Sequence, residues 1–179
     1  ETVPDSPEGF EAIAESVARK SLKEKMREEA DNAVIEEFSA SVGDIISGEV
    51  QQGRDESVIY VYLGGRTEGK IPPTEQVKGE TFKHGDRIKA FVVKVEKGLR
   101  GPEITLSRTH PQLVRALFAL EVPEINDRVV EVMGVSREPG QRSKISVRTH
   151  RAGVSPKGAL IGPSGARSRA VSDELFGEK

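Results

Sequence analysis

Two glycines three residues apart, in the segment ALIGPSGARSR at residues 159–169, are the part of this sequence best suited to contact a phosphate. Gly162 and Gly165 carry no side chain and tolerate backbone angles that other residues avoid, so the chain could bring its amides close to a ligand. A helix starting near Ala166 would add unpaired amides and the positive end of its dipole. The same spacing also occurs at ordinary turns between helices, so the glycines alone leave both interpretations open.

The charge around this segment favours a ligand that carries phosphate. The 179-residue chain has a formal net charge of −2, yet between positions 137 and 169 eight basic residues accompany a single acid, Glu138. A segment of that sign attracts phosphate groups, and it contains both glycines.

The elements that must position these residues change type along the chain. From Ser6 to about Phe38, apolar residues recur at helical spacing among charged ones, which predicts an amphipathic helix with a solvated charged face. From Val42 to Arg108 the period is two, and turns rich in glycine, proline or charge separate the segments. The five expected strands lie at 43–50, 57–63, 67–73, 86–95 and 102–107. Five short strands without an intervening helix predict a small barrel of the OB type.

From Pro111 onward the expected order is helix, strand, strand, helix, helix. The segments lie at 111–122, 128–136, 143–149, 157–162 and 166–176. This is the order of a bacterial-type (type II) KH domain without its last strand. The predicted fold is multidomain α+β: a connector helix at 1–41, a five-stranded antiparallel OB-type β-barrel at 42–107, and a truncated KH α/β domain at 108–179.

Several long stretches resemble the bacterial NusA family of transcription elongation and termination factors. They are LSRTHPQLVRALFALEVPEI, REPGQRSKISV and GALIGPSGARSRAVSDELFGEK, and the stretches TEGKIPPTEQVKGETFKHGDRIKAFVV and SPEGFEAIAESVARKSLKEKMREE fit the same family. Such long ordered motifs are far more specific than two spaced glycines. The resemblance implies the last helix of a polymerase-binding N-terminal domain, an RNA-binding barrel of the S1 type and the first KH domain. It also implies that most of the polymerase-binding domain, the last strand of this KH domain and a second KH domain lie outside this chain.

The resemblance implies that the glycine loop holds a few unstacked RNA nucleotides against its backbone, with basic flanks adding charge and apolar groups reading base edges. The residues expected to bind RNA are Ile161, Gly162, Pro163, Ser164, Gly165, Arg167 and Arg169, with Lys144 and Arg148 from the neighbouring strand. The centre of this loop carries no charge, so we expect binding through backbone and hydroxyl groups more than through side-chain charge.

The barrel offers a second candidate surface. Alternation places Tyr60 and Tyr62 on one face of their strand, and Lys89 beside Phe91 on one face of another. An aromatic ring beside a lysine can stack a single-stranded base. The residues expected to bind RNA here are Tyr60, Arg66, Lys70, Lys89 and Phe91. Strand phase alone does not separate stacking from packing in a core or between domains, so both interpretations stay open.

Catalysis is not expected. No carboxylates cluster around the loops, and His84, His110 and His150 lie in unrelated segments without metal-ligand spacing. We expect no metal and no cofactor. The predicted function is to bind nascent single-stranded RNA at RNA polymerase and to modulate pausing, termination and antitermination. The alternative is an RNA-binding module of translation or RNA decay, although in a polynucleotide phosphorylase the KH domain precedes the barrel.

The composition bears on location and partners. The chain has no cysteine, no apolar run of the roughly 18 residues needed to span a bilayer, and no secretory signal at its first residues. We therefore expect a cytoplasmic monomer without membrane contact. Its expected partners are single-stranded RNA and RNA polymerase, the latter mainly through the N-terminal domain that the resemblance places outside this chain.

Overall fold

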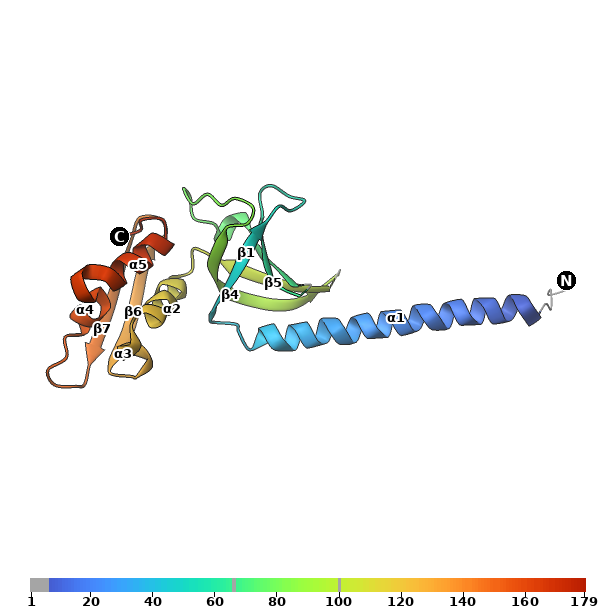
Figure 1. The fold of residues 1–179 in the computed structure, drawn as a ribbon, viewed down its shortest axis with the longest axis horizontal. Helices are drawn as coiled ribbons and strands as arrows, with labels where there is room; N and C mark the ends of the chain where they lie inside the picture. The colour runs from blue at the N-terminus through green and yellow to red at the C-terminus, as the bar shows by residue number, and fades with distance from the viewer. Residues whose placement is uncertain (1–6, 66, 100) are drawn as a thin grey trace.

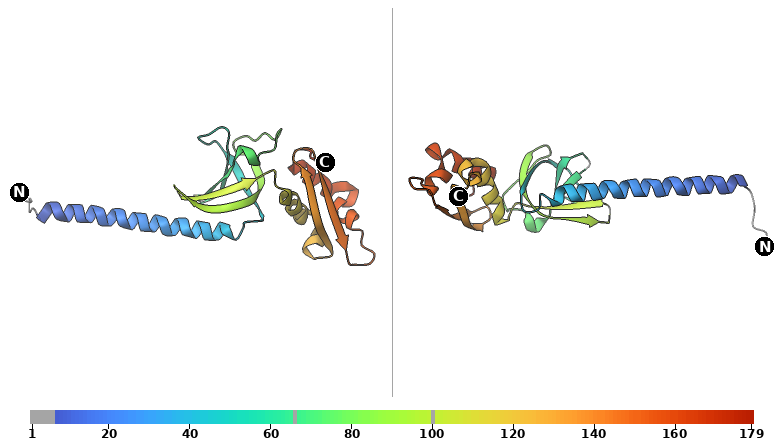
Figure 2. Two further views of the ribbon diagram at one scale, coloured as in Figure 1. Left: turned by 180° about the vertical axis from the view of Figure 1, so that it is seen from behind. Right: turned by 90° about the horizontal axis from the view of Figure 1, so that it is seen from below.

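The computed structural model describes residues 7–65, 67–99 and 101–179. A long helix, a barrel and an α/β segment follow one another along the longest axis of the molecule (Figures 1 and 2). Helix α1 (Pro7–Ser39) has 33 residues and therefore a length of about 50 Å. Only its last turns pack on the barrel, where Phe38 enters the barrel core and Val34 packs against that core. The rest of the described part of α1 projects away from the barrel.

The barrel contains all five expected strands. They are β1 (Ile45–Gln51), β2 (Ile59–Gly64), β3 (Thr67–Ile71), β4 (Arg87–Gly98) and β5 (Gly101–Ser107), closed in the order β1-β2-β3-β5-β4. Strand directions cannot alternate all the way around a closed ring with an odd number of strands, so one pair must be parallel. That pair is β3 with β5, where Gly69 pairs with Ile104 and Lys70 with Thr105. The other four strand pairs are antiparallel, in agreement with the predicted five-stranded OB-type barrel.

Inward-facing apolar side chains fill the barrel. Val61, Ile71, Val92 and Leu106 are almost completely buried within it. These residues follow the period of two from which the strands were predicted. A short 3-10 helix, η1 (Pro73–Glu75), follows β3.

The C-terminal segment confirms the expected order of helices and strands. Its elements are α2 (Pro111–Glu121), α3 (Pro123–Asn126), β6 (Val130–Glu138), β7 (Arg142–Thr149), α4 (Pro156–Ile161), the 3-10 helix η2 (Pro163–Gly165) and α5 (Ala166–Glu174). Strands β6 and β7 form an antiparallel hairpin. Helices α2, α4 and α5 contribute Leu113, Leu160 and Val171 to one core, against which Ile145 and Val147 of β7 pack. The sequence did not predict α3 or η2.

The last residue pairs with strand β7. The amide of Ser143 donates to the carbonyl of Lys179 at 2.6 Å, and the amide of Lys179 donates to the carbonyl of Gln141 at 3.1 Å. This is the hydrogen-bond pattern of two parallel strands. In the described part of the chain, none of the helices is long and apolar enough to cross a membrane.

Candidate nucleic-acid interface

The loop between α4 and α5 has an unusual backbone. Gly162, Ser164 and Gly165 all have positive φ angles, of 72°, 52° and 77°. The left-handed region is strained for residues other than glycine, so Ser164 is held there by its surroundings. A Cβ atom added to Gly162 would lie 2.6 Å from Cγ of Arg167. Positive φ therefore favours glycine at both positions, and at Gly162 a side chain would also collide with Arg167.

The two arginines after the loop support it from within. Arg167 donates from Nη1 to the carbonyl of Ala159 at 2.7 Å and to Oε2 of Glu124 at 2.9 Å. Arg169 donates from Nη2 to the carbonyl of Ser164 at 2.6 Å. The pKa of the Glu124 carboxyl is lowered, mainly by a hydrogen bond from its own backbone amide. Desolvation by burial raises this pKa, and the hydrogen bond and charge of Arg167 lower it further. Arg167 is thus half-buried as a support for the loop, whereas Arg169 stays exposed at its edge.

The structure does not bring Lys144 and Arg148 to this loop. Both are exposed on β7, and they alternate with Ile145 and Val147, which pack into the core beneath the helices. They therefore lie on the face of the hairpin opposite the helices. Arg148 donates from Nε to Oε2 of Glu131 at 2.7 Å, and this hydrogen bond is the main cause of the lowered pKa of that carboxyl.

Lys157 of helix α4 lies near the loop, although it was not among the residues predicted to bind RNA. Ser155 caps this helix by accepting a hydrogen bond from the amide of Gly158 at 3.1 Å. Lys157 and Ile161 are exposed and lie four residues apart, so they share one side of the helix that leads into the loop. Helical spacing from Ile161 could have identified Lys157.

Tyr60 and Lys70 are neighbours on the outer face of the barrel. They are paired across β2 and β3, so their side chains lie side by side. Tyr60 is half-buried, and Nζ of Lys70 lies 3.7 Å from Oε1 of Glu103. Arg66, the third residue predicted for this surface, lies outside the described residues.

Phe91 and Lys89 contradict the prediction of a second stacking surface. Phe91 is 6% exposed, and its ring stacks on that of His110 with centroids 4.2 Å apart and planes at 8°. Its core neighbours include Leu113 of α2. Nζ of Lys89 is 3.1 Å from Oε2 of Glu174 in α5. The residues do face outward from the barrel, but the α/β segment covers that face, so Phe91 is not available to a base.

Buried polar contacts join the barrel to the α/β segment. Arg108, at the junction, donates to the backbone carbonyls of Lys89 and Glu174 at 2.7 and 2.8 Å. Arg137 of β6 donates to the carbonyl of Arg108 at 2.8 Å and pairs with Glu178, where Nη2 and Oε2 are 2.8 Å apart. These contacts fix the position of the glycine loop relative to the barrel.

Burial alone would raise the pKa of Glu178. The hydrogen bonds that its carboxylate accepts from Arg137, the amide of Gly140 and the hydroxyl of Ser143, together with the charge of Arg137, outweigh that effect and lower the pKa. Within residues 7–65, 67–99 and 101–179, no group of three histidine or acidic side chains could hold a metal ion.

Two family models divide the chain where the fold changes. The model described as S1 RNA binding domain matches residues 39–107, and the model described as NusA-like first KH domain matches residues 108–179. The transcription termination/antitermination protein NusA of Mycobacterium tuberculosis is 48% identical over 181 residues, which is 98% of this chain and 52% of the relative. The protein of that name from Bacillus subtilis is 45% identical over 174 residues, 97% of this chain and 46% of its own length. This chain is a homologue of NusA.

The chain spans about half the length of the NusA proteins that it matches. The identity extends over nearly all of this chain, so NusA similarity includes α1 as well as the S1 and KH segments. Among solved structures, the solution structure of GSP13 from Bacillus subtilis matches 37% of this chain and 53% of its own at a TM-score of 0.31 and 26% identity. That likeness is too low to support an argument about NusA function.

Proposed function

We propose that this chain is the RNA-binding part of a NusA-type transcription factor. It binds nascent single-stranded RNA at RNA polymerase and so modulates pausing, termination and antitermination. The observation that carries the proposal is the 48% identity to a termination/antitermination protein across both the S1 and KH segments. In this proposal, residues 1–41 connect a polymerase-binding domain to a barrel at 42–107 and a KH domain at 108–179. The protein acts in the cytoplasm as a non-catalytic monomer.

The KH loop contacts the sugar-phosphate backbone in this proposal. Gly162 and Gly165 allow RNA to approach the main chain, and the first amides of α5 point toward the phosphates. Pro163 and Ser164 are exposed at the centre of the loop, and Ile161, 40% exposed, supplies an apolar surface for a base. The surrounding positive potential comes from Arg167 and Arg169 in the first turn of α5, and from Lys144 and Arg148 on the far side of the hairpin.

The barrel binds the same strand of RNA through Tyr60, Lys70 and Arg66. Tyr60 stacks on a base and the cations balance phosphate charge. Because Arg108 and Arg137 hold barrel and KH segment together, the two surfaces meet the RNA at a fixed separation. Once one surface has bound the RNA, the other surface meets the same strand at high effective concentration. Two contacts that are weak by themselves can then together hold the RNA.

The experiment that tests this function is a titration of single-stranded RNA into wild type and a variant with Pro163→Asp and Ser164→Asp. Two carboxylates would repel phosphate at the loop centre, and we expect the affinity to fall at least about tenfold. A variant with Ala12→Glu and Ser21→Glu matches the charge change on an exposed part of α1 and should bind as wild type does. Equal affinity of wild type and the loop variant would remove the loop from the site.

Salt dependence gives an independent test. Binding that neutralises several phosphates releases counterions, so the logarithm of the affinity should fall linearly and steeply with the logarithm of salt concentration. A flat dependence between low and physiological salt would point to a protein-binding surface instead.

A further inference from the structure

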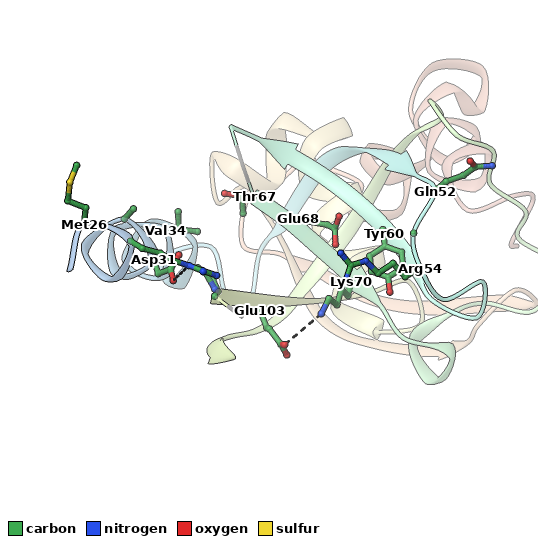
Figure 3. A pocket seen from close by; sticks show the side chains of 15 residues that line it. Met26, Asp31, Val34, Gln52, Arg54, Tyr60, Thr67, Glu68, Lys70 and Glu103 are labelled. Atoms are coloured by element: carbon green, nitrogen blue, oxygen red, sulfur yellow. Dashed lines mark ion pairs between the residues drawn. The ribbon is translucent and has the colours of Figure 1, made fainter. Parts of the chain in front are cut away.

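A groove of about 1230 Å³ separates helix α1 from the outer face of β2, β3 and β5 (Figure 3). Met26, Ala30 and Val34 of α1 line it, and their spacing of four residues places them along one side of the helix. Tyr60 and Lys70 line it from the barrel. The barrel surface proposed above to bind RNA is therefore one wall of a two-walled groove, and α1 is the other.

The loop after β1 holds the tyrosine ring in this groove. A Cβ atom on Gly53 would overlap the ring of Tyr60, so the backbone of this loop lies directly against the ring. Gly53 lines the groove as well. A ring held in this way presents a fixed apolar surface, which lowers the entropy lost when a flat ligand stacks on it.

Among the residues that the structure describes, the lining of the groove carries as many basic as acidic side chains. They are Arg27, Arg54, Lys70, Asp31, Glu68 and Glu103. Two of the pairs are close, because Nζ of Lys70 is 3.7 Å from Oε1 of Glu103 and Nε of Arg27 is 4.0 Å from Oδ2 of Asp31. The described lining therefore offers a phosphate less positive charge than the basic segment around the KH loop does.

The carboxylates of the groove instead suit a base edge that donates hydrogen bonds. Glu68 is exposed on β3 and the side chain of Glu103 on β5 is 43% exposed, so both can accept from a ligand. The exocyclic amino groups of cytosine and adenine are donors of this kind, and carboxylates accept from cytosine N4 in nucleic-acid complexes. Uracil has one ring N–H donor between two carbonyl oxygens, and those oxygens repel a carboxylate.

We propose that the groove between α1 and the barrel binds the base of a single-stranded RNA nucleotide and prefers a base with an exocyclic amino group over uracil. The base stacks on Tyr60 and donates to the acidic side chains, while α1 closes the groove on the opposite side. The inference rests on the proposed function, since it requires that this chain binds RNA. It adds a second wall to the barrel site and a base preference.

The two methionines of the chain allow a direct test. Met26 lines the groove, whereas Met133 lies on β6 of the KH segment. With ¹³C-labelled methionine methyl groups, a tetranucleotide of cytidines titrated into the intact chain should shift the Met26 resonance. The affinity read at Met26 should be about fivefold higher for the cytidine than for the uridine tetranucleotide, as expected for one exposed base contact.

Two substitutions on α1 form a matched pair. Ala30→Glu places a bulky anion in the groove and should lower the cytidine affinity read at Met26 about tenfold. Asn32→Glu makes the same charge change 200° around the helix and should leave that affinity unchanged. An Ala30→Glu variant that binds as tightly as Asn32→Glu would overturn the role of α1.

The outcomes also separate this inference from the proposed function. If Met26 does not respond while RNA binding still depends on Pro163 and Ser164, the groove is not a base site and the proposed function stands. Equal affinities for cytidine and uridine at Met26 would overturn the base preference. If no RNA binds anywhere on the chain, the proposed function itself fails.

Discussion

Arg108 and Glu80 form a two-point salt bridge at the junction between the barrel and the KH segment. Nη2 lies 2.6 Å from Oε1 and Nε lies 2.9 Å from Oε2, and the side chains are 1% and 3% exposed. The guanidinium also lies over the ring of Phe82, 5.6 Å from its centroid. Together with the carbonyl of Glu174, which accepts from the same guanidinium, this connects a barrel loop, the end of β5 and the end of α5 through one side chain.

Removing this arginine should destabilise the chain strongly. Arg108→Ala would leave the carboxylate of Glu80 buried without its partner, and losing one member of a buried pair costs about 3–5 kcal/mol. We expect the free energy of unfolding, measured by urea denaturation, to fall by that amount. Arg108→Lys should also destabilise, because one ammonium group cannot replace the planar two-point contact.

An exposed pair provides the control for this experiment. Nε of Arg142 lies 3.3 Å from Oε2 of Glu138, and the two side chains are 62% and 63% exposed. Arg142→Ala should therefore change the free energy of unfolding by less than about 1 kcal/mol. If Arg108→Ala and Arg142→Ala unfold at the same urea concentration, the buried bridge does not hold the two segments together.

Acid should weaken the contact between Glu178 and Arg137. The pKa of Glu178 is lower in the folded chain than its ordinary value of 4.5. The ionised carboxylate therefore stabilises the fold fully above the unfolded pKa, and this contribution is lost as pH falls through the folded pKa. Melting temperatures between pH 7 and pH 3 should show Glu178→Gln less stable than wild type at neutral pH, with the difference shrinking below about pH 4. A difference that stays constant over this range would contradict the assignment.

Alanine at Gly162 should impair both the loop and RNA binding. Gly162 has a φ of 72° and would place its new Cβ against Arg167, whereas Gly153 has a φ of 79° and nothing within 4 Å of that position. The backbone strain, about 1–2 kcal/mol, is common to Gly162→Ala and Gly153→Ala. Only Gly162→Ala adds the steric overlap, so it should be the less stable of the two in urea denaturation. Only this variant should lose RNA affinity in the titration; equal loss in both would implicate general instability.

Substitution of Phe91 and of Tyr60 should have different effects, because one ring packs in the core and the other is proposed to bind RNA. Phe91→Ala removes a buried side chain from the junction core and should lower the free energy of unfolding by about 3–5 kcal/mol. Tyr60→Ala should leave more of the stability intact and weaken RNA binding by roughly 1–3 kcal/mol, the range measured for one stacked base. Denaturation and RNA titration of both variants provide the comparison, and a Tyr60→Ala variant with wild-type affinity would exclude a stacking role.

Much of the fold could be predicted because its signals are local. The period of two along β4 puts Ile88, Ala90 and Val92 on one face of the strand, and all three lie in the barrel core. The same period places Phe91 on the outer side, but it contains no information on what covers that side. Only the three-dimensional structure shows that His110 and α2 lie there, which is why the predicted stacking surface at Phe91 is wrong.

The candidate site shows the same limit. Glycine spacing identified the loop, since positive φ angles at Gly162 and Gly165 are a property of the backbone. The partners of Arg167 were not predictable, because Glu124 is 43 residues away in the sequence and meets it only after α3 and α5 have packed. Position in the sequence therefore suggested a phosphate contact for Arg167, where the fold uses it as a support.

The parallel pair in the barrel has a consequence for local opening. Strands β3 and β5 pair at two positions, whereas β4 and β5 pair at seven. Few paired residues join β3 to β5, and parallel pairing is slightly less stable than antiparallel pairing. We therefore expect the barrel to open first between these two strands, so the amides that pair there should exchange with deuterium earliest. Lys70 is one of the two β3 residues that pair with β5, and it also lines the groove beside α1. A ligand that contacts both α1 and Lys70 would hold β3 in place from the outer face of the barrel and slow this exchange.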